Sequence, residues 1–325
     1  MIDKLNRRIE YMRISVTDRC NLRCVYCMPE EGIEYISHDE ILSFDEILKI
    51  CRCVAKLGIK KIKITGGEPL VRKDIISLIR KIKDIEGIEQ VTLTSNGVLL
   101  YDMAEELYDA GIDSVNISLD TLDRDEFIRI TRRDRYENVV KSIDKLMDLG
   151  IKVKINCLAI KEHNLDDLVN IAAYAKGNNI DVRFIELMPI GYGKNYTVVS
   201  NEIILNMLEE KHGSFKLVNE KRGNGPAVYY RNKDFEGCIG FISAISHEFC
   251  ETCNRVRLTA NGFLKLCLHY NKGIDLKAPM RNNISDEELT EMIYYAIINK
   301  PLGHNFSNDE SIDNLEVKNM VQIGG

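Results

Sequence analysis

The stretch GIKKIKIT at residues 58–65 joins a glycine to a short run in which isoleucines alternate with lysines. Glycine suits the left-handed position that ends a helix, and alternation with a period of two is typical of a β-strand. The pattern returns as GIEQVTLT (87–94), GIDSVNIS (111–118) and GIKVKINC (150–157), and more loosely as GNNIDVRF (177–184). Each copy predicts the end of a helix followed directly by a strand, and this repeat decides the fold.

The segments before these glycines have the periodicity of helices. Apolar residues follow the spacing i, i+3, i+4, i+7 at Phe44, Ile47, Leu48 and Cys51, and again at Ile75, Leu78, Ile79 and Ile82. Alternating helices and strands are typical of parallel βα units. With an early strand near residues 13–16, about six strands are expected, too few to close an eight-stranded barrel. Residues 1–190 are therefore predicted to be α/β, an incomplete TIM-type barrel.

Residues 191–325 do not continue the repeat of helix, glycine and strand. A helix is expected near 203–210, β-rich pieces such as AVYY and CIGFISAI follow, and a second helix is expected near 286–299. We interpret this part as a C-terminal α+β region that closes the barrel mouth.

The two faces of the predicted strands differ in polarity. One face is apolar: Ile62, Ile64, Val91, Leu93, Val115, Ile117, Val153 and Ile155. The other is polar: Lys63, Thr65, Thr92, Thr94, Asn96, Asn116, Ser118, Asp120, Lys154 and Asn156. Helices cover the outside of a parallel barrel, so the polar face is expected to line the lumen and to suit a large anionic ligand. The alternative is that some strands are edge strands with one solvated face.

Composition narrows the class of protein. The chain has 325 residues and a net charge of −6, which argues against broad nucleic-acid binding because that usually needs a basic surface. The first residues contain no apolar signal core, and no apolar run is long enough to span a bilayer. We therefore expect a cytoplasmic protein that binds neither nucleic acid nor membrane.

Six of the ten cysteines form two triplets. Cys20, Cys24 and Cys27 have the spacing C-x3-C-x2-C, and Cys250, Cys253 and Cys267 have the spacing C-x2-C-x13-C. Thiols remain reduced in the cytosol, so clustered cysteines favour a metal site, and six thiolates favour iron–sulfur or zinc. The remaining four, Cys51, Cys53, Cys157 and Cys238, sit alone among apolar neighbours and are expected in the core.

Each triplet lacks a fourth ligand. His247 or His269 would complete a zinc site at the second triplet. Alternatively, a [4Fe–4S] cluster held by three cysteines leaves one iron open to a small molecule. Composition and spacing leave both readings open.

The motifs resemble a known enzyme superfamily. CNLRCVYC, with Tyr26 before its last cysteine, and GGEPL at 66–70 are similar to the signatures of radical S-adenosylmethionine enzymes. Over nearly the whole chain, DRCNLRCVYCMP, ITGGEPLVR, TLTSNG, NISLDTLD, RFIELMP, CETCNRVRLTANGFLKLC and the final Gly-Gly resemble the GTP 3′,8-cyclase family.

The resemblance implies a lyase that starts molybdenum cofactor biosynthesis. A 5′-deoxyadenosyl radical would abstract the ribose 3′ hydrogen of GTP, and the sugar radical would attack guanine C8 to give 3′,8-cyclo-7,8-dihydro-GTP. The implied cofactors are S-adenosylmethionine and two [4Fe–4S] clusters, held by Cys20, Cys24 and Cys27 and by Cys250, Cys253 and Cys267. The family's positions for S-adenosylmethionine correspond to Tyr26, Gly67, Ser118 and Met188.

The resemblance also implies a GTP site. Its positions correspond to Arg13, Lys63, Thr94, Lys154, Arg255, Val256 and Arg257. Arg forks suit phosphate oxygens, and Lys63 stands where the family usually has Arg, so the charge is kept but the bidentate fork is lost. Catalytic positions would be Arg255, Arg257 and the tail glycines Gly324 and Gly325, which the family is thought to bring into the active site.

Partners implied by the resemblance are a flavodoxin or ferredoxin as electron donor, the downstream cyclic pyranopterin monophosphate synthase, and a second copy in a homodimer. Two other functions compete. One is a radical peptide-modifying maturase with an auxiliary cluster, although such enzymes usually carry more C-terminal cysteines. The other is a non-enzymatic zinc or nucleic-acid-binding module. The acidic net charge and the GGEPL loop argue against this alternative.

Overall fold

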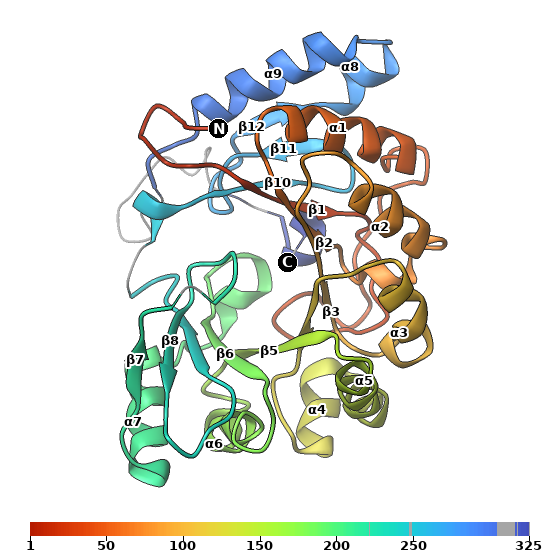
Figure 1. Cartoon of the computed structure of the whole chain (residues 1–325). Coiled ribbons are helices and arrows are strands. Elements are labelled where there is room, and N and C mark those ends of the chain that lie inside the picture. The colour runs from red at the N-terminus through yellow and green to blue at the C-terminus, as the bar shows by residue number, and fades with distance from the viewer. Residues whose placement is uncertain (221, 247–248, 304–315, 317, 325) are drawn as a thin grey trace.

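The computed structural model describes residues 1–220, 222–246, 249–303, 316 and 318–324. Its centre is a 12-stranded sheet with the order β12-β11-β10-β1-β2-β3-β4-β5-β6-β9-β8-β7 (Figure 1). The strands are β1 (Tyr11–Ser15), β2 (Lys61–Thr65), β3 (Gln90–Ser95), β4 (Ser114–Ser118), β5 (Lys152–Ala159), β6 (Asp181–Glu186), β7 (Lys216–Val218), β8 (Val228–Arg231), β9 (Ile239–Ile242), β10 (Arg255–Leu258), β11 (Phe263–Lys265) and β12 (Gly273–Asp275).

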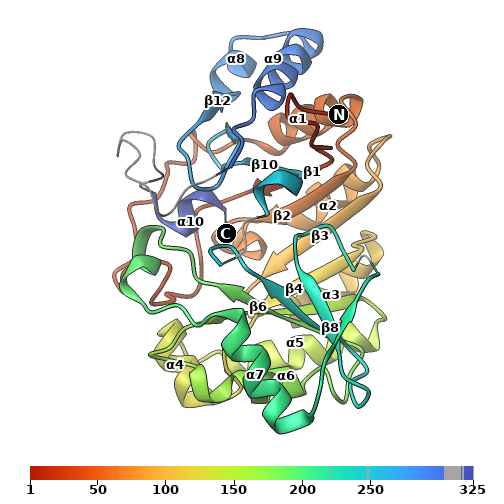
Figure 2. The same cartoon turned by 90° about the vertical axis from the view of Figure 1, so that its left-hand side faces the viewer.

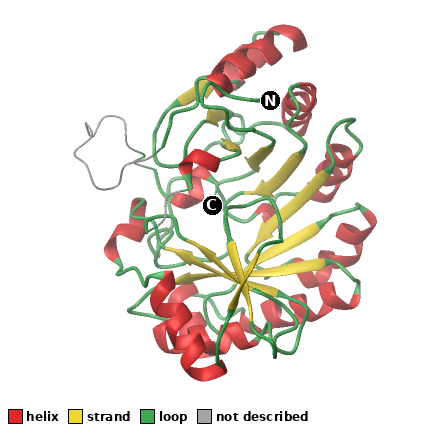
Figure 3. Ribbon diagram, turned by 60° about the vertical axis from the view of Figure 1, so that its left-hand side comes forward, coloured by secondary structure: helices red, strands yellow, loops and turns green. Residues whose placement is uncertain are grey.

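Helices lie outside the arc of strands, as Figure 3 shows. They are α1 (Phe44–Lys56), α2 (Ile75–Lys83), α3 (Leu100–Asp109), α4 (Arg124–Thr131), α5 (Tyr136–Asp148), α6 (Leu168–Ala173), α7 (Asn201–His212), α8 (Lys277–Arg281) and α9 (Asp286–Ile298). A last short helix, α10 (Met320–Ile323), lies instead in the middle of the molecule (Figure 2). Single 3-10 turns are η1 (Pro69–Val71), η2 (Leu165–Asp167), η3 (Gly191–Asn195) and η4 (Cys250–Thr252).

The parallel part of the sheet is larger than the sequence predicted. Strands β1 to β6 are parallel and in chain order, as expected. However, β10 pairs parallel with β1, and β9 pairs parallel with β6. About six strands was therefore too low a count, because strands from residues 191–325 pair with both edges of the sheet. An unpaired edge would leave a row of main-chain N–H and C=O groups without partners.

Glycines end three of the helices as the repeat predicted. Gly58, Gly111 and Gly150 follow the C-caps of α1, α3 and α5 with φ of 85°, 76° and 73°. At α1 the N–H of Gly58 donates to Ala55 and the N–H of Ile59 donates to Val54, which is the Schellman pattern. Gly87 also has a positive φ but lies three residues beyond its C-cap. The loose copy differs, since Gly177 is not among the glycines with positive φ.

The predicted helix and strand faces are confirmed. The apolar strand residues from Ile62 to Ile155 belong to one buried core, as do Cys51, Cys53 and Cys157. Cys238 is also fully buried. Helix α9 packs on α1, so the C-terminal region shares the layer of helices outside the barrel. Within the described residues we find no helix with the length and apolar character needed to cross a membrane.

The N-terminus of α1 is fixed by a capping box, which gives a stability prediction. Ser43 Oγ accepts from the N–H of Glu46 at 3.1 Å, and Glu46 Oε2 accepts from the N–H of Ser43 at 2.6 Å. Ser43→Ala is expected to lower the free energy of unfolding by about 1 kcal/mol, measured by urea denaturation. Ser77→Ala, in the first turn of α2 but not at its N-cap, is the control, and an equal loss there would contradict a capping effect.

Candidate active site

One cavity inside the barrel is lined by both cysteine triplets. It has a volume of about 330 Å³. All six clustered cysteines contribute to its wall, together with Arg13, Thr94, Arg255 and Arg257. The four lone cysteines do not. Two groups of thiols that are some 230 residues apart in sequence thus line one cavity, so they could act on the same bound molecule.

The first triplet follows β1 in a loop built by short main-chain contacts. The N–H of Cys27 donates to the carbonyl of Cys24 at 2.9 Å, which folds the end of the motif into a turn. Cys20 Sγ accepts from the N–H of Leu22 at 3.4 Å and from Nδ2 of Asn96 at 3.7 Å. Donors of this kind stabilise a thiolate when a metal binds it.

Burial keeps the first triplet protonated in the absence of metal. It raises the pKa of Cys20 to about 11 and that of Cys27 to about 12. Burial also raises the pKa of Cys24, and the neighbouring thiols of Cys27 and Cys20 raise it further. Thiols that raise one another's pKa become thiolates together only if a cation replaces their protons. Among the described residues, no group of three or more His, Cys, Asp or Glu side chains is arranged to hold a single metal ion, whereas a donor set of three thiols suits an iron–sulfur cluster.

The GGEPL loop packs tightly against the segment that leads into the first triplet. The N–H of Gly67 donates to the main-chain carbonyl of Thr17 at 2.7 Å, and the N–H of Glu68 donates to the main-chain carbonyl of Arg19 at 2.8 Å. A Cβ on Gly67 would lie 2.4 Å from the carbonyl oxygen of Arg19. Glycine is therefore required at Gly67, since two main chains pass with no room for a side chain.

Glu68 braces this loop from inside the core. Its carboxylate accepts from Ser95 Oγ at 2.9 Å, from the N–H of Asn96 at 2.7 Å and from the N–H of Leu70 at 3.1 Å. Burial raises the pKa of Glu68 to about 7 in spite of these donors. Glu68 thus links the loop after β2 to the end of β3.

All four predicted S-adenosylmethionine residues line the cavity: Tyr26, Gly67, Ser118 and Met188. The hydroxyl of Tyr26 donates to Oδ2 of Asp120 at 2.7 Å, and Oδ1 of Asp120 accepts from the N–H of Leu158 at 2.8 Å. Burial raises the pKa of Asp120 to about 6. Asp120 was placed on the lumen face from the sequence but was given no role; its contact with Tyr26 shows that it orients the aromatic ring.

The second triplet lies in a more cationic environment. Cys250 and Cys253 bracket η4, and Cys267 follows β11. Burial opposes ionisation of Cys253, but the charges of Lys300 and Arg255 outweigh it and lower its pKa to about 7. His269 also lines the cavity, whereas His247, the other possible zinc ligand, lies outside the described residues.

Positively charged side chains converge in the lumen. On neighbouring strands, Arg257, Arg13 and Lys63 are in register. Burial and the charges of Arg183 and Arg13 lower the pKa of Lys63 well below its usual value. Burial likewise lowers the pKa of Arg13. The buried Nε of Arg13 and the Nε and Nη2 of Arg183 have no hydrogen-bond partner among the described residues.

Sequence reasoning missed Arg183. It pairs with Asn156 in the sheet and therefore faces the lumen, between the outward Val182 and Phe184. The signal was present in the fifth copy of the repeat, where applying the same alternation would have placed Arg183 inward. Because the strands form an arc (Figure 3), Arg183 lies close enough to Lys63 and Arg13, four and five strands away in the sheet, for its charge to lower their pKa.

Two other predicted GTP residues are placed differently. The ammonium of Lys154 contacts Asp181 Oδ2 at 2.8 Å and the carbonyl of Arg222 at 2.9 Å, so it already has an acidic partner. Val256 alternates with Arg255 and Arg257 on β10, and its side chain lies in the hydrophobic core. Only its main chain is available to a ligand in the lumen.

The C-terminal tail enters the barrel. The carbonyl of Gly324 accepts from Thr65 Oγ1 at 3.3 Å and from Arg257 Nη1 at 3.4 Å. Gly324 has a φ of 81°, and a Cβ there would lie 2.6 Å from Cβ of Ser15. The position therefore demands glycine. Gly325 lies outside the described residues.

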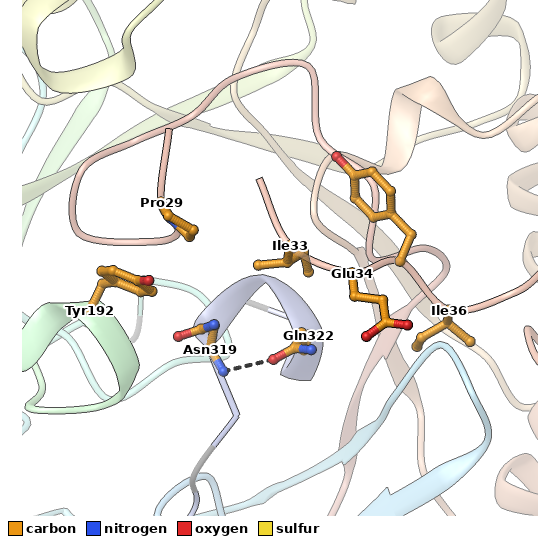
Figure 4. A pocket seen from close by; sticks show the side chains of 8 residues that line it. Pro29, Ile33, Glu34, Ile36, Tyr192, Asn319 and Gln322 are labelled. Carbon is orange, nitrogen blue, oxygen red and sulfur yellow. Dashed lines mark hydrogen bonds between the residues drawn. The ribbon is translucent and has the colours of Figure 1, made fainter. Parts of the chain in front are cut away.

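Helix α10 separates two cavities. Met320 and Val321 line the barrel cavity, while Asn319 and Gln322 line a second one of about 410 Å³ with Tyr192, Pro29 and residues 33–36. Figure 4 shows Asn319 and Gln322, joined by a 3.0 Å hydrogen bond, between Tyr192 and Ile33. The tail helix is thus a wall of the lumen beside the first triplet.

Comparison with known proteins agrees with this geometry. The model of the Radical SAM superfamily matches residues 14–175, and that of Molybdenum Cofactor Synthesis C matches residues 180–306. A GTP 3′,8-cyclase of Clostridium perfringens (strain SM101 / Type A) is 47% identical over 325 residues, covering 100% of both chains. The chain belongs to the GTP 3′,8-cyclase family. A GTP 3′,8-cyclase of Desulforamulus reducens is 46% identical over 329 residues and also covers 100% of both chains.

Solved structures similar to this GTP 3′,8-cyclase family member share its fold. Streptococcus suis SuiB bound to S-adenosylmethionine superposes with a TM-score of 0.61 at 17% identity, covering 91% of this chain and 67% of SuiB. SuiB bound to the precursor peptide SuiA gives a TM-score of 0.63 at 15% identity, covering 98% and 71%. At this identity the likeness shows the partial TIM-barrel α/β fold alone, and a peptide substrate is not transferred.

The contact at Gly67 gives a test of the cofactor loop. Gly67→Ala is expected to displace the loop or the segment before Cys20, since the nearest atoms belong to the main chain and cannot move aside. We expect at least about a tenfold loss of S-adenosylmethionine affinity, measured by equilibrium dialysis of the reconstituted chain.

Gly177→Ala is the matched control, because a Cβ there has no neighbour within 4 Å. Equal affinities in the two variants would contradict the role of the close approach.

Proposed function

We propose that this chain is a radical S-adenosylmethionine enzyme that converts GTP to 3′,8-cyclo-7,8-dihydro-GTP in molybdenum cofactor biosynthesis. The observation that carries the proposal is the single cavity lined by both cysteine triplets and by arginines. The relatives named GTP 3′,8-cyclase, at 42–47% identity, support the same reaction.

The cofactors are S-adenosylmethionine and two iron–sulfur clusters. Cys20, Cys24 and Cys27 would hold the first cluster, and Cys250, Cys253 and Cys267 the second. When bound, the first cluster and S-adenosylmethionine would supply a carbon radical able to remove the ribose 3′ hydrogen, a step beyond the acid–base chemistry of protein side chains. The buried wall around the first triplet keeps water from that radical.

The residues proposed for S-adenosylmethionine are Tyr26, Gly67, Ser118 and Met188. Gly67 gives the main chain of the loop its close approach, and Asp120 fixes the ring of Tyr26 by the 2.7 Å hydrogen bond. These contacts orient the cofactor rather than take part in bond breaking.

GTP would lie between the second triplet and the cationic strands. The proposed contacts from the resemblance are Arg13, Lys63, Thr94, Lys154, Arg255, Val256 and Arg257, to which we add Arg183. Buried guanidinium groups without an anion are costly, and triphosphate oxygens would relieve that cost. Arg13, on the strand next to Lys63, and Arg183, on β6, would supply the bidentate fork that Lys63 lacks.

Arg255, Arg257 and the tail glycines are the proposed groups nearest the reacting atoms. The contact of Arg257 with the carbonyl of Gly324 would couple the tail to the substrate site. A phosphate or guanine oxygen that binds Arg257 would compete with this carbonyl, so the tail position responds to substrate.

We further propose two structural parts, residues 1–190 with the first cluster and residues 191–325 with the second, the latter closing the barrel mouth. The proposed partners are a flavodoxin or ferredoxin as electron donor, the downstream cyclic pyranopterin monophosphate synthase, and a second copy in a homodimer. A cytoplasmic location suits ten free cysteines and oxidation-sensitive clusters.

An anaerobic turnover tests the proposal. Reconstituted protein is mixed with dithionite, S-adenosylmethionine and GTP, and products are read by mass spectrometry. We expect 5′-deoxyadenosine together with an isomer of GTP of unchanged mass. Formation of 5′-deoxyadenosine with intact GTP would mean a different substrate, and zinc in place of iron and sulfide would sink the radical reaction altogether.

Removing single guanidinium groups tests the phosphate assignment. Arg183→Ala and Arg257→Ala are each expected to raise the Kd of GTP by roughly 10- to 100-fold, since a hydrogen bond to a charged group contributes about 1.5–3 kcal/mol. Affinity for S-adenosylmethionine should be unchanged. Arg129→Ala removes an arginine whose side chain is 64% exposed and serves as control. GTP affinity equal to that of the control would exclude Arg183 from the site.

A further inference from the structure

Arg7 is a buried arginine outside the cavity whose contacts are unusually complete. Its Nη1 donates to the carbonyls of Cys250 at 3.2 Å and Leu302 at 2.9 Å. Its Nη2 donates to the carbonyls of Lys300 at 3.0 Å and Pro301 at 2.8 Å, and Nε donates to Asp3 Oδ2 at 2.7 Å. The guanidinium has five N–H donors, so each of them has an acceptor.

These acceptors join two segments that are distant in sequence. The carbonyls at 300–302 lie one to three residues beyond Asn299, the C-cap of α9, so they need donors from outside the helix. The fourth carbonyl belongs to Cys250, the first ligand of the second triplet. Arg7 thus ties the chain after α9 directly to the backbone of a cluster cysteine.

The N-terminal loop of residues 3–7 is held in a conformation that places the Arg7 side chain against these carbonyls. Oδ1 of Asp3 accepts from the N–H groups of Leu5 and Arg7 at 3.0 and 2.8 Å, and Asn6 has a φ of 61°. The side chains of Arg7 and Asp3 are 3% and 0% exposed. Asp3 therefore fixes the guanidinium from the opposite side and balances its charge.

The segment held by Arg7 forms a wall of the second triplet. A Cβ on Gly303 would lie 2.9 Å from Cβ and 3.3 Å from Sγ of Cys250, so this segment passes directly against the thiol. Lys300 is 5% exposed, lines the cavity, and its Nζ donates to the carbonyl of Leu266, the residue before Cys267. One short segment touches both ends of the triplet.

We propose that Arg7, held by Asp3, is a positioning residue for the second cluster. Arg7 fixes the segment 300–302 against Cys250, and Lys300 in that segment fixes Cys267 through the carbonyl of Leu266. The inference rests on the proposed function insofar as the second triplet holds a cluster. It concerns residues of the N-terminus, far from the triplet in sequence. A planar fork is needed, because one ammonium with three donors cannot satisfy four carbonyls and a carboxylate.

The first experiment isolates the second cluster. In the full chain with Cys20, Cys24 and Cys27 changed to Ala, reconstituted iron, sulfide and the electron paramagnetic resonance spectrum with and without GTP are measured. Arg7→Ala is expected to speed removal of iron by a chelator about tenfold and to abolish the spectral response to GTP. Arg7→Lys is expected to give an intermediate rate.

The control is the neighbouring Arg8→Ala, since the Arg8 side chain is 72% exposed. If Arg7→Ala does not fold, as judged by circular dichroism, Arg7→Lys and Asp3→Asn carry the test with smaller changes of the same sign. Iron release and spectra equal to those of Arg8→Ala would overturn the proposal.

The second experiment needs no cluster. In the metal-free chain with all its cysteines, alkylation of each thiol is followed by peptide mass spectrometry. Arg7→Ala should speed alkylation of Cys250 and leave that of Cys24 unchanged, and equal rates at Cys250 would overturn the proposal. If the parent chain binds no second cluster, the proposed function is wrong, and alkylation of Cys250 alone decides the role of Arg7.

Discussion

The parallel pairing of β10 with β1 is the interaction on which the site depends. An open parallel barrel ends in strands whose outer N–H and C=O groups need partners, and β10 satisfies those of β1. Because β10 begins two residues after Cys253, this hydrogen bonding brings the second triplet to the cavity that the first triplet lines. The same register sets Arg257 beside Arg13. Main-chain pairing therefore brings both cysteine triplets and two of the arginines that line the cavity together.

Cationic side chains gathered in the lumen lower the stability of the fold but suit the binding of an anion. The side chains that point out of the barrel wall are mostly apolar and those that point inward are mostly polar. Lys63 is therefore buried, and Arg13 and Arg183 half-buried, close to one another in the lumen. Burial is the main cause of the lowered pKa values of Arg13 and Lys63, and the charges of neighbouring arginines lower both values further. By contrast, Lys154 is balanced by Asp181. A triphosphate is the kind of ligand that turns such a cluster from a cost into a favourable contact.

Particular residues mark the limit of sequence reasoning. Alternation along β2 to β5 correctly separated core from lumen, because one face of each strand must meet the covering helices. The same rule would have found Arg183 had it been applied to β6. The pairing of Tyr26 with Asp120 joins residues 94 positions apart, and four hydrogen bonds of Arg7 join the N-terminus to residues 250 and 300–302. No local pattern encodes such contacts.

The sequence by itself determined the repeating helix–strand units, the two faces of each strand and the two cysteine triplets, since these depend on local conformation, periodicity and chemical type. Only the tertiary structure decided that the C-terminal strands continue the sheet at both edges, that both triplets share one cavity, and that Gly324 reaches Thr65 and Arg257. Those features arise from hydrogen-bond pairing and close packing between distant segments, and their energies depend on which segments meet.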